Sequence, residues 1–217
     1  RFLDGFEPLS ILGQGKYSVV YKAKNVKDQL IYAVKRIALD ISQKNVNDAL
    51  KEVVAMESFK HPGIVQFHDA WKEQPPIATC VELCQYTLED WISSNEPRDM
   101  DRIEIWFKQI VSAVDYIHEM GYIHRDLKPS NILFSSKDRL KVCDLGIIAD
   151  SVIKNESANT DGTGVSKGRT LQMGSPLYMA PEQIFQGSCF PFFDSKVDIF
   201  TLGLILIEMC TVLKQNE

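Results

Sequence analysis

The sequence lacks several patterns that would assign it to a specialised class of protein. None of its apolar runs approaches the roughly 18 residues that a membrane-spanning helix requires, and its first residues show no signal-peptide pattern. The 217 residues carry a net charge of −5, whereas proteins that bind nucleic acids usually present an excess of basic residues. We therefore expect neither a membrane segment nor direct nucleic-acid binding in this chain.

Cysteine is scarce and is not arranged for metal binding. The five cysteines form an odd count, and no two of them form a C-x-x-C pair. Because a disulfide framework needs pairs and a zinc site usually needs closely spaced ligands, reduced thiols are the better interpretation. Reduced thiols are typical of the cytosol.

The most informative stretch comprises residues 122–134, together with residues 144–146. Asp126, Lys128 and Asn131 lie on one short loop between apolar segments, and Asp144 follows a second apolar run. Two carboxylates, an amide and an ammonium at this spacing suit a reaction that needs a proton acceptor, a divalent metal and charge neutralisation. Phosphoryl transfer requires all three. The simpler alternative is a polar loop followed by an unrelated capping aspartate.

These residues resemble the catalytic loop H-R-D-L-K-x-x-N and the metal-binding segment D-F-G of eukaryotic protein kinases, with leucine in place of the phenylalanine. The resemblance implies that Asp126 accepts or orients the proton of the substrate hydroxyl group. It implies that Lys128 neutralises charge on the transferred phosphoryl group, and that Asn131 and Asp144 hold Mg²⁺. Lysine two residues after the aspartate resembles serine/threonine kinases rather than tyrosine kinases.

A glycine-rich segment near the N-terminus suits a phosphate-binding turn. Gly13 and Gly15 would let backbone N–H groups approach phosphate oxygens, although a plain hairpin turn is an alternative. The kinase pattern expects a third glycine where this chain has Ser18. Val20 follows at the spacing where kinases pack an aliphatic side chain on adenine.

Residues 31–37 alternate as a half-buried strand that places Lys35 on the same face as Ala33. An inward-facing lysine is costly unless it is paired, although a lysine that reaches out to solvent is also compatible with the strand. By resemblance, Lys35 grips the α and β phosphates of ATP. Its expected partner is Glu52, on a helix over residues 45–59; Glu57 is a second candidate.

The resemblance also defines the rest of the ATP site. A strand over residues 77–82 leads into a hinge at residues 82–84, whose backbone would bond adenine, and Val81 takes the gatekeeper position. An ordinary buried valine is equally compatible with the sequence. The implied ATP-binding residues are Leu12, Gly13, Gly15, Val20, Ala33, Lys35, Glu82, Cys84 and Leu133.

Three helices are expected in the part of the chain that follows residue 84. Helices are predicted over residues 88–93 and 101–120, and the second carries an apolar stripe and ends at Gly121. Residues 196–209 read as a buried helix. By resemblance, Asp198 bonds the backbone of the catalytic loop.

Residues 151–168 turn polar, and a segment of this composition cannot bury enough surface to order itself. They stand where kinases keep an activation loop, which closes at the A-P-E motif ending in Glu182. We predict Thr170 as the activating phosphosite, with its phosphate paired to Arg125, and the alternative is an unmodified loop threonine. Ser175 is interpreted as part of the peptide-binding floor.

The resemblance implies an α+β, bilobal protein-kinase fold that uses ATP and Mg²⁺. The small β-rich N-lobe is expected at residues 1–84. The larger helical C-lobe is expected at residues 85–217, with the catalytic loop at 124–131 and the activation segment at 144–182. Because kinase domains usually continue with further helices, we expect the C-lobe to be truncated at Glu217.

Residues 61–71, 83–84, 90–92 and 174–183 resemble the kinases that phosphorylate the alpha subunit of translation initiation factor 2. Residues 196–206 look most like the endoplasmic-reticulum-stress member of that family. The family implies homodimerisation through the N-lobe and a cytoplasmic catalytic domain, which segments outside this sequence can tether to the endoplasmic reticulum membrane. The alternatives are a serine/threonine kinase with another protein substrate, and a pseudokinase that serves as a scaffold.

Overall fold

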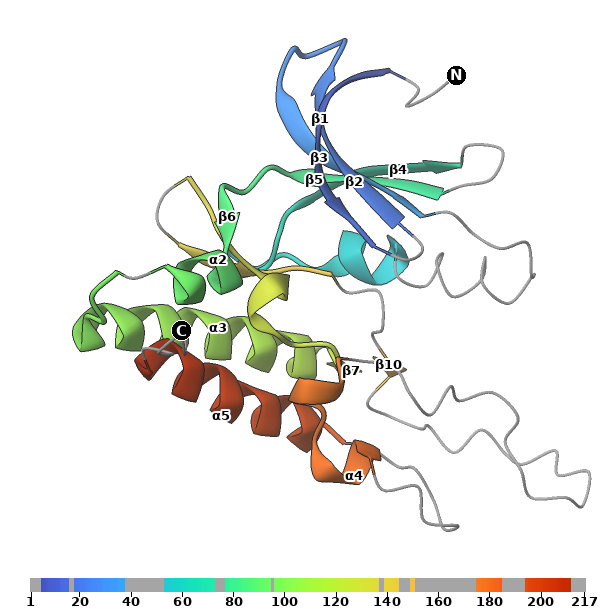
Figure 1. Cartoon of the computed structure of the whole chain (residues 1–217). Coiled ribbons are helices and arrows are strands. Elements are labelled where there is room, and N and C mark those ends of the chain that lie inside the picture. The colour runs from blue at the N-terminus through green and yellow to red at the C-terminus, as the bar shows by residue number, and fades with distance from the viewer. Residues whose placement is uncertain are drawn as a thin grey trace, which may run out of the picture.

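The structure of the chain is a computed structural model. It describes residues 5–15, 18–37, 53–72, 77–94, 96–136, 139–144, 149–150, 175–184 and 194–211. The elements form two lobes, and Figure 1 shows a β-sheet above a group of helices. This arrangement confirms the expected α+β, bilobal fold.

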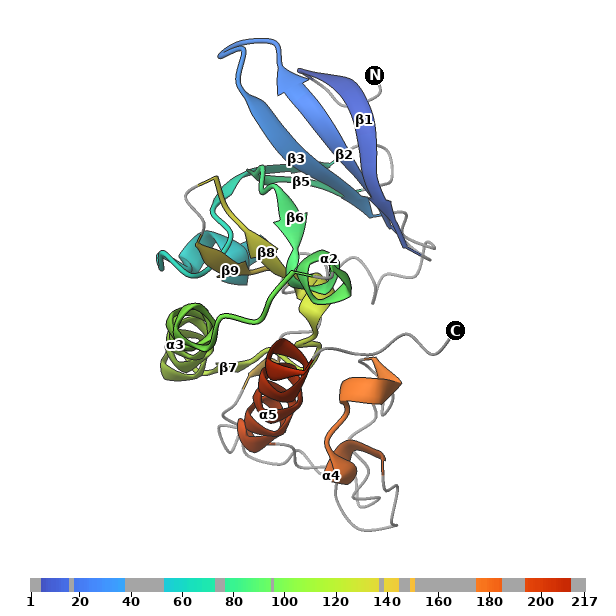
Figure 2. The ribbon, with the colours of Figure 1, turned by 60° about the vertical axis from the view of Figure 1, so that its left-hand side comes forward.

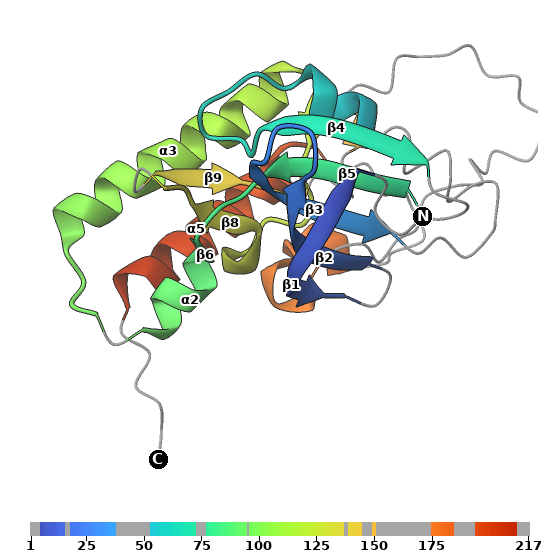
Figure 3. The ribbon, with the colours of Figure 1, turned by 90° about the horizontal axis from the view of Figure 1, so that it is seen from above.

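Five antiparallel strands form the sheet of the upper lobe, in the order β1-β2-β3-β5-β4. Figure 3, seen from above, shows β3, β5 and β4 side by side. Residues 31–37 and 77–82 form strands with the predicted bounds, because both segments are rich in β-branched and aromatic residues or alternate in polarity. The strands are β1 (Phe6–Gln14), β2 (Ser18–Asn25), β3 (Ile31–Ile37), β4 (Phe67–Lys72) and β5 (Ile77–Glu82).

Three shorter strands, β6 (Tyr86–Thr87), β8 (Ile132–Phe134) and β9 (Leu140–Val142), lie between this sheet and the helices, as Figure 2 shows. They form one small sheet, in the order β6-β8-β9. The strands β7 (Tyr122–Ile123) and β10 (Ala149–Asp150) pair in another, and the 3-10 turn η1 (Pro129–Asn131) precedes β8. The predicted catalytic loop therefore runs between β7 and β8, beneath the large sheet.

The helices α2 (Leu88–Ser93) and α3 (Met100–Glu119) confirm the two predicted helices. Thr87 and Asp90 form a reciprocal capping box at the start of α2. The side chain of Asp99 accepts hydrogen bonds from two backbone N–H groups at the start of α3. Gly121 follows the end of α3 with a φ of 84°, a conformation that glycine adopts without steric cost.

The third predicted helix is α5 (Lys196–Cys210), and the turn η2 (Pro176–Tyr178) and the short helix α4 (Pro181–Ile184) precede it. One face of α5, with Leu202, Ile205 and Met209, packs into the same buried cluster as α3. In the described part of the chain the other face exposes Ile199 by 49% and Ile207 by 59%. The prediction of a buried helix is therefore confirmed for the first face and wrong for the second.

The larger core lies in the lower lobe and joins α2, α3, β8, β9 and α5. It also takes in Ala55 and Phe59, which belong to or directly follow the helical residues 53–58. Among the described residues, no helix has the length and apolar character needed to cross a membrane. The cysteines of the described segments, Cys80, Cys84, Cys143 and Cys210, are all free thiols, as the sequence predicted.

Candidate functional site

Asp198, in the first turn of α5, holds the predicted catalytic loop in place. One of its carboxylate oxygens accepts hydrogen bonds from the backbone N–H of His124 and from Nε2 of His118, both at 2.8 Å. The other oxygen accepts the backbone N–H of Arg125 at 2.9 Å. These bonds confirm that Asp198 contacts the backbone of the loop.

The carboxylate of Asp198 is only 1% exposed. Burial alone would raise its pKa, but the hydrogen bond from His118, the charge of His124 and the two backbone bonds together lower the pKa below its ordinary value. Asp198 is therefore ionised at neutral pH and keeps its three donors.

Two residues of the candidate site have a left-handed backbone. In the described part of the chain, the residues other than glycine with positive φ are Gln29, Arg125 (67°) and Asp144 (58°). Gln29 lies in the turn between β2 and β3, where this conformation is ordinary. Outside turns it costs roughly 1–2 kcal/mol and is often retained at functional sites. Arg125 and Asp144 thus mark the loop and the end of β9 as positions where the fold maintains strain.

Four donors converge on the carboxylate of Asp126, which is 8% exposed. Oδ2 accepts Nζ of Lys128 at 2.8 Å and Nδ2 of Asn131 at 3.1 Å. Oδ1 accepts the backbone N–H and the hydroxyl group of Ser175, at 3.0 and 3.1 Å. Nζ of Lys128 also donates to the hydroxyl group of Ser175 at 2.9 Å. This network fixes the orientation of the carboxylate.

Asn131 connects Asp126 to the segment that carries Asp144. Its side-chain nitrogen donates to the backbone carbonyl of Asp126 at 2.8 Å, and its backbone carbonyl accepts the N–H of Cys143 at 2.9 Å. Among the described residues, no donor bonds the side-chain oxygen of Asn131. That oxygen remains available as a ligand.

Lys35 and Asp144 meet across the two lobes. Nζ of Lys35 donates to Oδ1 of Asp144 at 2.5 Å, and the two side chains are 22% and 39% exposed. Burial raises the pKa of Asp144, but the charge and hydrogen bond of Lys35, with the charges of His124 and Lys128, bring it below its ordinary value. The strand β3 and the end of β9 thus bring one ammonium and one carboxylate together.

The register of the sheet aligns several of the predicted nucleotide-binding residues. Gly13 pairs with Val20, and Val20 pairs with Lys35, so these three positions form one row across β1, β2 and β3. In the same sheet, Ala33 pairs with Val81 of β5. A one-residue shift would turn each side chain to the opposite face, so this pairing keeps Lys35 and Ala33 on the face toward Asp144.

The other predicted nucleotide-binding residues lie on β1, β5 and β8 or within two residues of the ends of these strands. Leu12 is 49% exposed on β1, and the N–H of Gly15 donates to the carbonyl of Ser18 at 2.8 Å. Leu133 is half-buried on β8. Glu82 ends β5, and Cys84 follows two residues later. Burial first, and then the carboxylate of Glu82, raises the pKa of the Cys84 thiol to about 11, although Lys141 acts in the opposite direction.

Several predictions lie outside the described residues. Glu52, the expected partner of Lys35, is one of them, and so is the phosphosite candidate Thr170. The same holds for most of the predicted activation segment.

Two interactions of this site do not follow from the sequence. The sequence indicates a place for Ser175 in the peptide-binding floor, yet its hydroxyl and backbone N–H bond Asp126. His118 supports Asp198 from the last turn of α3. The partners are 49 and 80 residues apart in the sequence, so no local pattern pairs them.

The chain is similar in sequence to a known protein family and to several individual proteins. The chain matches the family described as "Protein kinase domain" over residues 6–215. The chain belongs to the protein kinase family. The kinase is 33% identical to the interferon-induced, double-stranded RNA-activated protein kinases of Mus musculus and Rattus norvegicus, with 96% and 100% of the chain aligned. It is also 33% identical to the serine/threonine-protein kinase ULK3 of Homo sapiens, over 95% of the chain.

The kinase chain spans 40% to 43% of the length of these three relatives. Together, the family match and the relatives show a serine/threonine protein kinase domain. Such a domain takes its phosphoryl group from ATP, typically with Mg²⁺.

The residues present fit Mg²⁺ and ATP. Mg²⁺ is usually held by one or two carboxylates together with substrate phosphates, rather than by a complete protein cage. Asp144 supplies a carboxylate, Asn131 supplies a side-chain oxygen with no donor among the described residues, and Lys35 supplies a cation beside them. Within the described segments there is no group of three or more His, Cys, Asp or Glu side chains that could hold a metal ion.

Proposed function

We propose that this kinase domain phosphorylates serine on the alpha subunit of translation initiation factor 2 and so reduces protein synthesis under stress. The observation that carries the phosphoryl-transfer chemistry is the convergence of Lys128, Asn131 and Ser175 on the carboxylate of Asp126. A buried carboxylate in a fixed orientation suits a group that orients a hydroxyl proton. The resemblance of the sequence supports the choice of substrate.

We assign the roles as follows. Bound Mg²⁺–ATP supplies the phosphoryl group and neutralises part of its charge. Asp126 accepts or orients the proton of the substrate serine hydroxyl at a carboxylate oxygen. Lys128, whose Nζ lies 2.8 Å from Asp126 and 2.9 Å from Ser175, balances the negative charge at the same point. Asn131 and Asp144 hold the metal ion through their side-chain oxygens.

The nucleotide is proposed to lie between the large sheet and the small sheet that contains β8. Lys35 would bind the α and β phosphates, and Glu52 would hold Lys35. The backbone of residues 82–84 would bond adenine. Leu12, Gly13, Gly15, Val20, Ala33 and Leu133 would line the pocket around them. The row formed by Gly13, Val20 and Lys35 supports this placement, since it joins three of these residues on one sheet.

The choice of substrate rests on the resemblance of residues 61–71 and 174–183 to the initiation-factor kinases. Residues 196–206 favour the endoplasmic-reticulum-stress member, PERK, within that group. On this proposal the catalytic domain is cytoplasmic and acts in the response to unfolded protein. Fractionation of cells that express the whole protein would test whether it is anchored in the endoplasmic reticulum membrane.

We further propose that the N-lobe comprises residues 1–84 and the C-lobe residues 85–217, and that two copies pair through the N-lobe. Two exposed apolar side chains of this lobe, Ile11 on β1 at 59% and Leu30 in the connection between β2 and β3 at 60%, support such a contact. Phosphorylation of Thr170, paired with Arg125, is proposed to activate the kinase. Sedimentation and phosphosite mapping would test these two points.

A serine/threonine kinase with a different protein substrate is the second candidate. The specific reason is that ULK3 of Homo sapiens is as similar to this chain, at 33% identity, as the double-stranded RNA-activated kinases are. Overall similarity therefore does not separate the substrates of these relatives.

The decisive experiment is transfer of labelled phosphate from Mg-ATP to purified initiation factor 2 alpha subunit, with a general serine peptide as a second acceptor. The proposal predicts that the alpha subunit is labelled in preference to the peptide. Labelling of the kinase itself and of the peptide, but not of the alpha subunit, would retain the kinase and reject the substrate. No transfer to any acceptor by a folded protein phosphorylated on Thr170 would favour a scaffold.

A further inference from the structure

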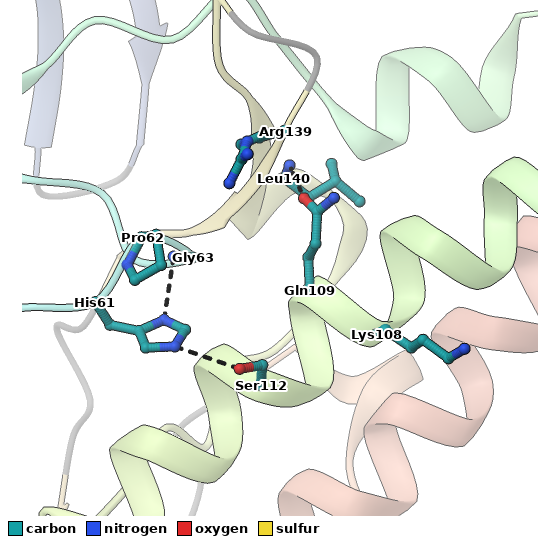
Figure 4. A pocket seen from close by; sticks show the side chains of 8 residues that line it. All are labelled: His61, Pro62, Gly63, Lys108, Gln109, Ser112, Arg139 and Leu140. Carbon is teal, nitrogen blue, oxygen red and sulfur yellow. Dashed lines mark hydrogen bonds between the residues drawn. The ribbon is translucent and has the colours of Figure 1, made fainter.

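A segment that follows residues 53–58 is fastened to α3. Nδ1 of His61 accepts the N–H of Gly63 at 3.1 Å, and its Nε2 lies 3.3 Å from the hydroxyl group of Ser112 (Figure 4). A Cβ on Gly63 would stand 3.0 Å from Cβ of Ala113 and 3.2 Å from the carbonyl oxygen of Gln109. The backbone at Gly63 therefore runs directly against α3, where a larger residue would not fit.

The strand β9 is fastened to the same helix and to the same segment. The N–H of Leu140 donates to the side-chain oxygen of Gln109 at 2.9 Å. The N–H of Val142 donates to the carbonyl of Gly63 at 2.8 Å, and the N–H of Val65 donates to the carbonyl of Val142 at 2.9 Å. We call α3, residues 61–66 and β9 together the α3 platform.

The side chain of Glu82, at the end of β5, joins the upper sheet to this platform. Its Oε1 accepts the N–H of Gln66 at 2.6 Å and Nζ of Lys141 at 2.5 Å. The N–H of Glu82 also donates to the carbonyl of Gln66 at 2.9 Å. One residue of the upper sheet is thus bonded to two separate segments of the platform.

The Glu82–Lys141 pair differs from a surface ion pair in its exposure. Lys141 is 15% and Glu82 is 23% exposed, whereas Lys108 and Glu104, paired at 2.6 Å on α3, are 73% and 64% exposed. Water and salt screen an exposed pair strongly and a buried pair much less. The two pairs have similar lengths, but only the first is shielded enough to constrain the fold.

Glu82 and Lys141 each lie next to a part of the proposed nucleotide site. Glu82 begins the segment whose backbone is proposed to bond adenine, and Lys141 precedes Asp144 by three residues on the same extended segment. The ion pair therefore links the two ends of the proposed nucleotide site.

We propose that Glu82 and Lys141 are positioning residues that hold the adenine-binding segment at a fixed distance from Asp144 and thereby set the affinity for nucleotide. This inference rests on the proposed nucleotide site. Glu82 would contact adenine through its backbone atoms only, because its carboxylate is hydrogen-bonded to Gln66 and Lys141.

The test is calorimetric binding of Mg-ADP to the wild-type protein and to Lys141→Met, Glu82→Gln and the double variant. The dissociation constant should rise about 5- to 50-fold in each single variant, a typical range for coupling between sites. The double variant should be no weaker than the weaker single variant, because both changes remove one interaction. Lys141→Arg should bind within about threefold of wild type, and the control Lys108→Met should bind as wild type.

In the phosphate-transfer assay, Lys141→Met should raise KM for ATP while kcat and KM for the protein substrate stay within about twofold. Circular dichroism establishes that each variant is folded, and Glu82→Gln keeps the test valid where Lys141→Met does not fold. Unchanged Mg-ADP affinity in folded Lys141→Met and Glu82→Gln would overturn the positioning role while leaving the proposed function intact. Failure of wild type to bind Mg-ADP would overturn the nucleotide site itself, and with it this role.

Discussion

In the upper sheet the buried cluster consists of small side chains, whereas the cluster beneath it consists of large ones. The first contains Ala23, Val34, Ala78 and Cys80. The second includes Leu88, Ile103, Ile110, Phe134, Leu140, Ile205 and Met209, all less than 2% exposed.

Burial stabilises roughly in proportion to the apolar area removed from water, so we expect the lower lobe to be the more stable part of the molecule. Asp126, Asn131 and Asp144 lie on or beside elements of the lower lobe, while Lys35 lies on the upper sheet. The two halves of the candidate site therefore stand on cores of different stability, and each lobe can be tested separately.

The largest effect is expected from Phe134→Ala in the lower cluster. Phe134 is fully buried and contacts the rings of Trp106 and Tyr86, with centroids 4.8 and 4.6 Å away. Removing it should lower the free energy of unfolding by about 3–5 kcal/mol, measured by urea denaturation. The control Leu177→Ala, at a position 87% exposed, should change it by less than about 0.5 kcal/mol. A loss below about 1 kcal/mol for Phe134→Ala would contradict the comparison.

The next largest effect is expected from Asp198→Asn, which removes the charge that holds the catalytic loop. The amide cannot accept all three donors, so the free energy of unfolding should fall by about 1–3 kcal/mol. Phosphate transfer should fall with it, because Arg125 loses a bond that compensates its backbone strain. The control is Asp115→Asn on the exposed face of α3.

The difference in the free energy of unfolding between wild type and Asp198→Asn should also depend on pH, and the structure predicts the direction. Because the folded pKa of Asp198 is below its ordinary value, its contribution is fully present above the unfolded pKa of about 3.9. It is lost as the pH falls through the lower folded pKa. The stability gap between wild type and Asp198→Asn should therefore shrink in acid, and a gap that grows below pH 4 would reject this account.

A smaller effect is expected in the upper sheet from Val34→Ala. Val34 is fully buried on β3, and the change removes two methyl groups, which should cost about 1–2 kcal/mol. Val26→Ala, at a position 49% exposed in the turn after β2, is the matched control. If Val34→Ala destabilised the protein as much as Phe134→Ala does, the two lobes would not differ as described.

The smallest effect concerns the Cys84 thiol, which reports on the link between the lobes. Burial and the carboxylate of Glu82 raise the pKa of this thiol to about 11, and the charge of Lys141 opposes them. Glu82→Gln should therefore lower this pKa and speed alkylation of Cys84, while Lys141→Met should raise the pKa and slow it. Alkylation rates against pH, mapped to Cys84 by mass spectrometry, check both signs. A shift of the same sign in both variants would show that the pair does not lie beside this thiol.

Patterns within one segment of the sequence predicted much of the fold. The strands 31–37 and 77–82 and the helices 88–93 and 101–120 form nearly as expected, because polarity, capping residues and Gly121 all act over a few neighbouring residues. The second face of α5 could not be assigned, since apolar residues on both faces do not indicate which one is covered.

The candidate site was predicted only where its residues share a motif. Asp126, Lys128 and Asn131 lie within six positions of one another, and the structure brings them into one network. Two contacts were not predicted: the one between Ser175 and Asp126 and the one between Glu82 and Lys141. They join residues that are 49 and 59 positions apart. Only the packing of distant elements brings such partners together.

The central claim is that Asp126 and its partners carry phosphoryl transfer, and its most direct test is a single-turnover measurement. The rate of phosphate transfer from Mg-ATP should be compared between wild type, Asp126→Asn and the control Asp115→Asn, with Mg-ADP affinity measured for each. The account predicts a loss of about 10²- to 10⁴-fold for Asp126→Asn, with nucleotide affinity within about threefold of wild type and Asp115→Asn unaffected. Transfer by Asp126→Asn within tenfold of wild type would contradict it.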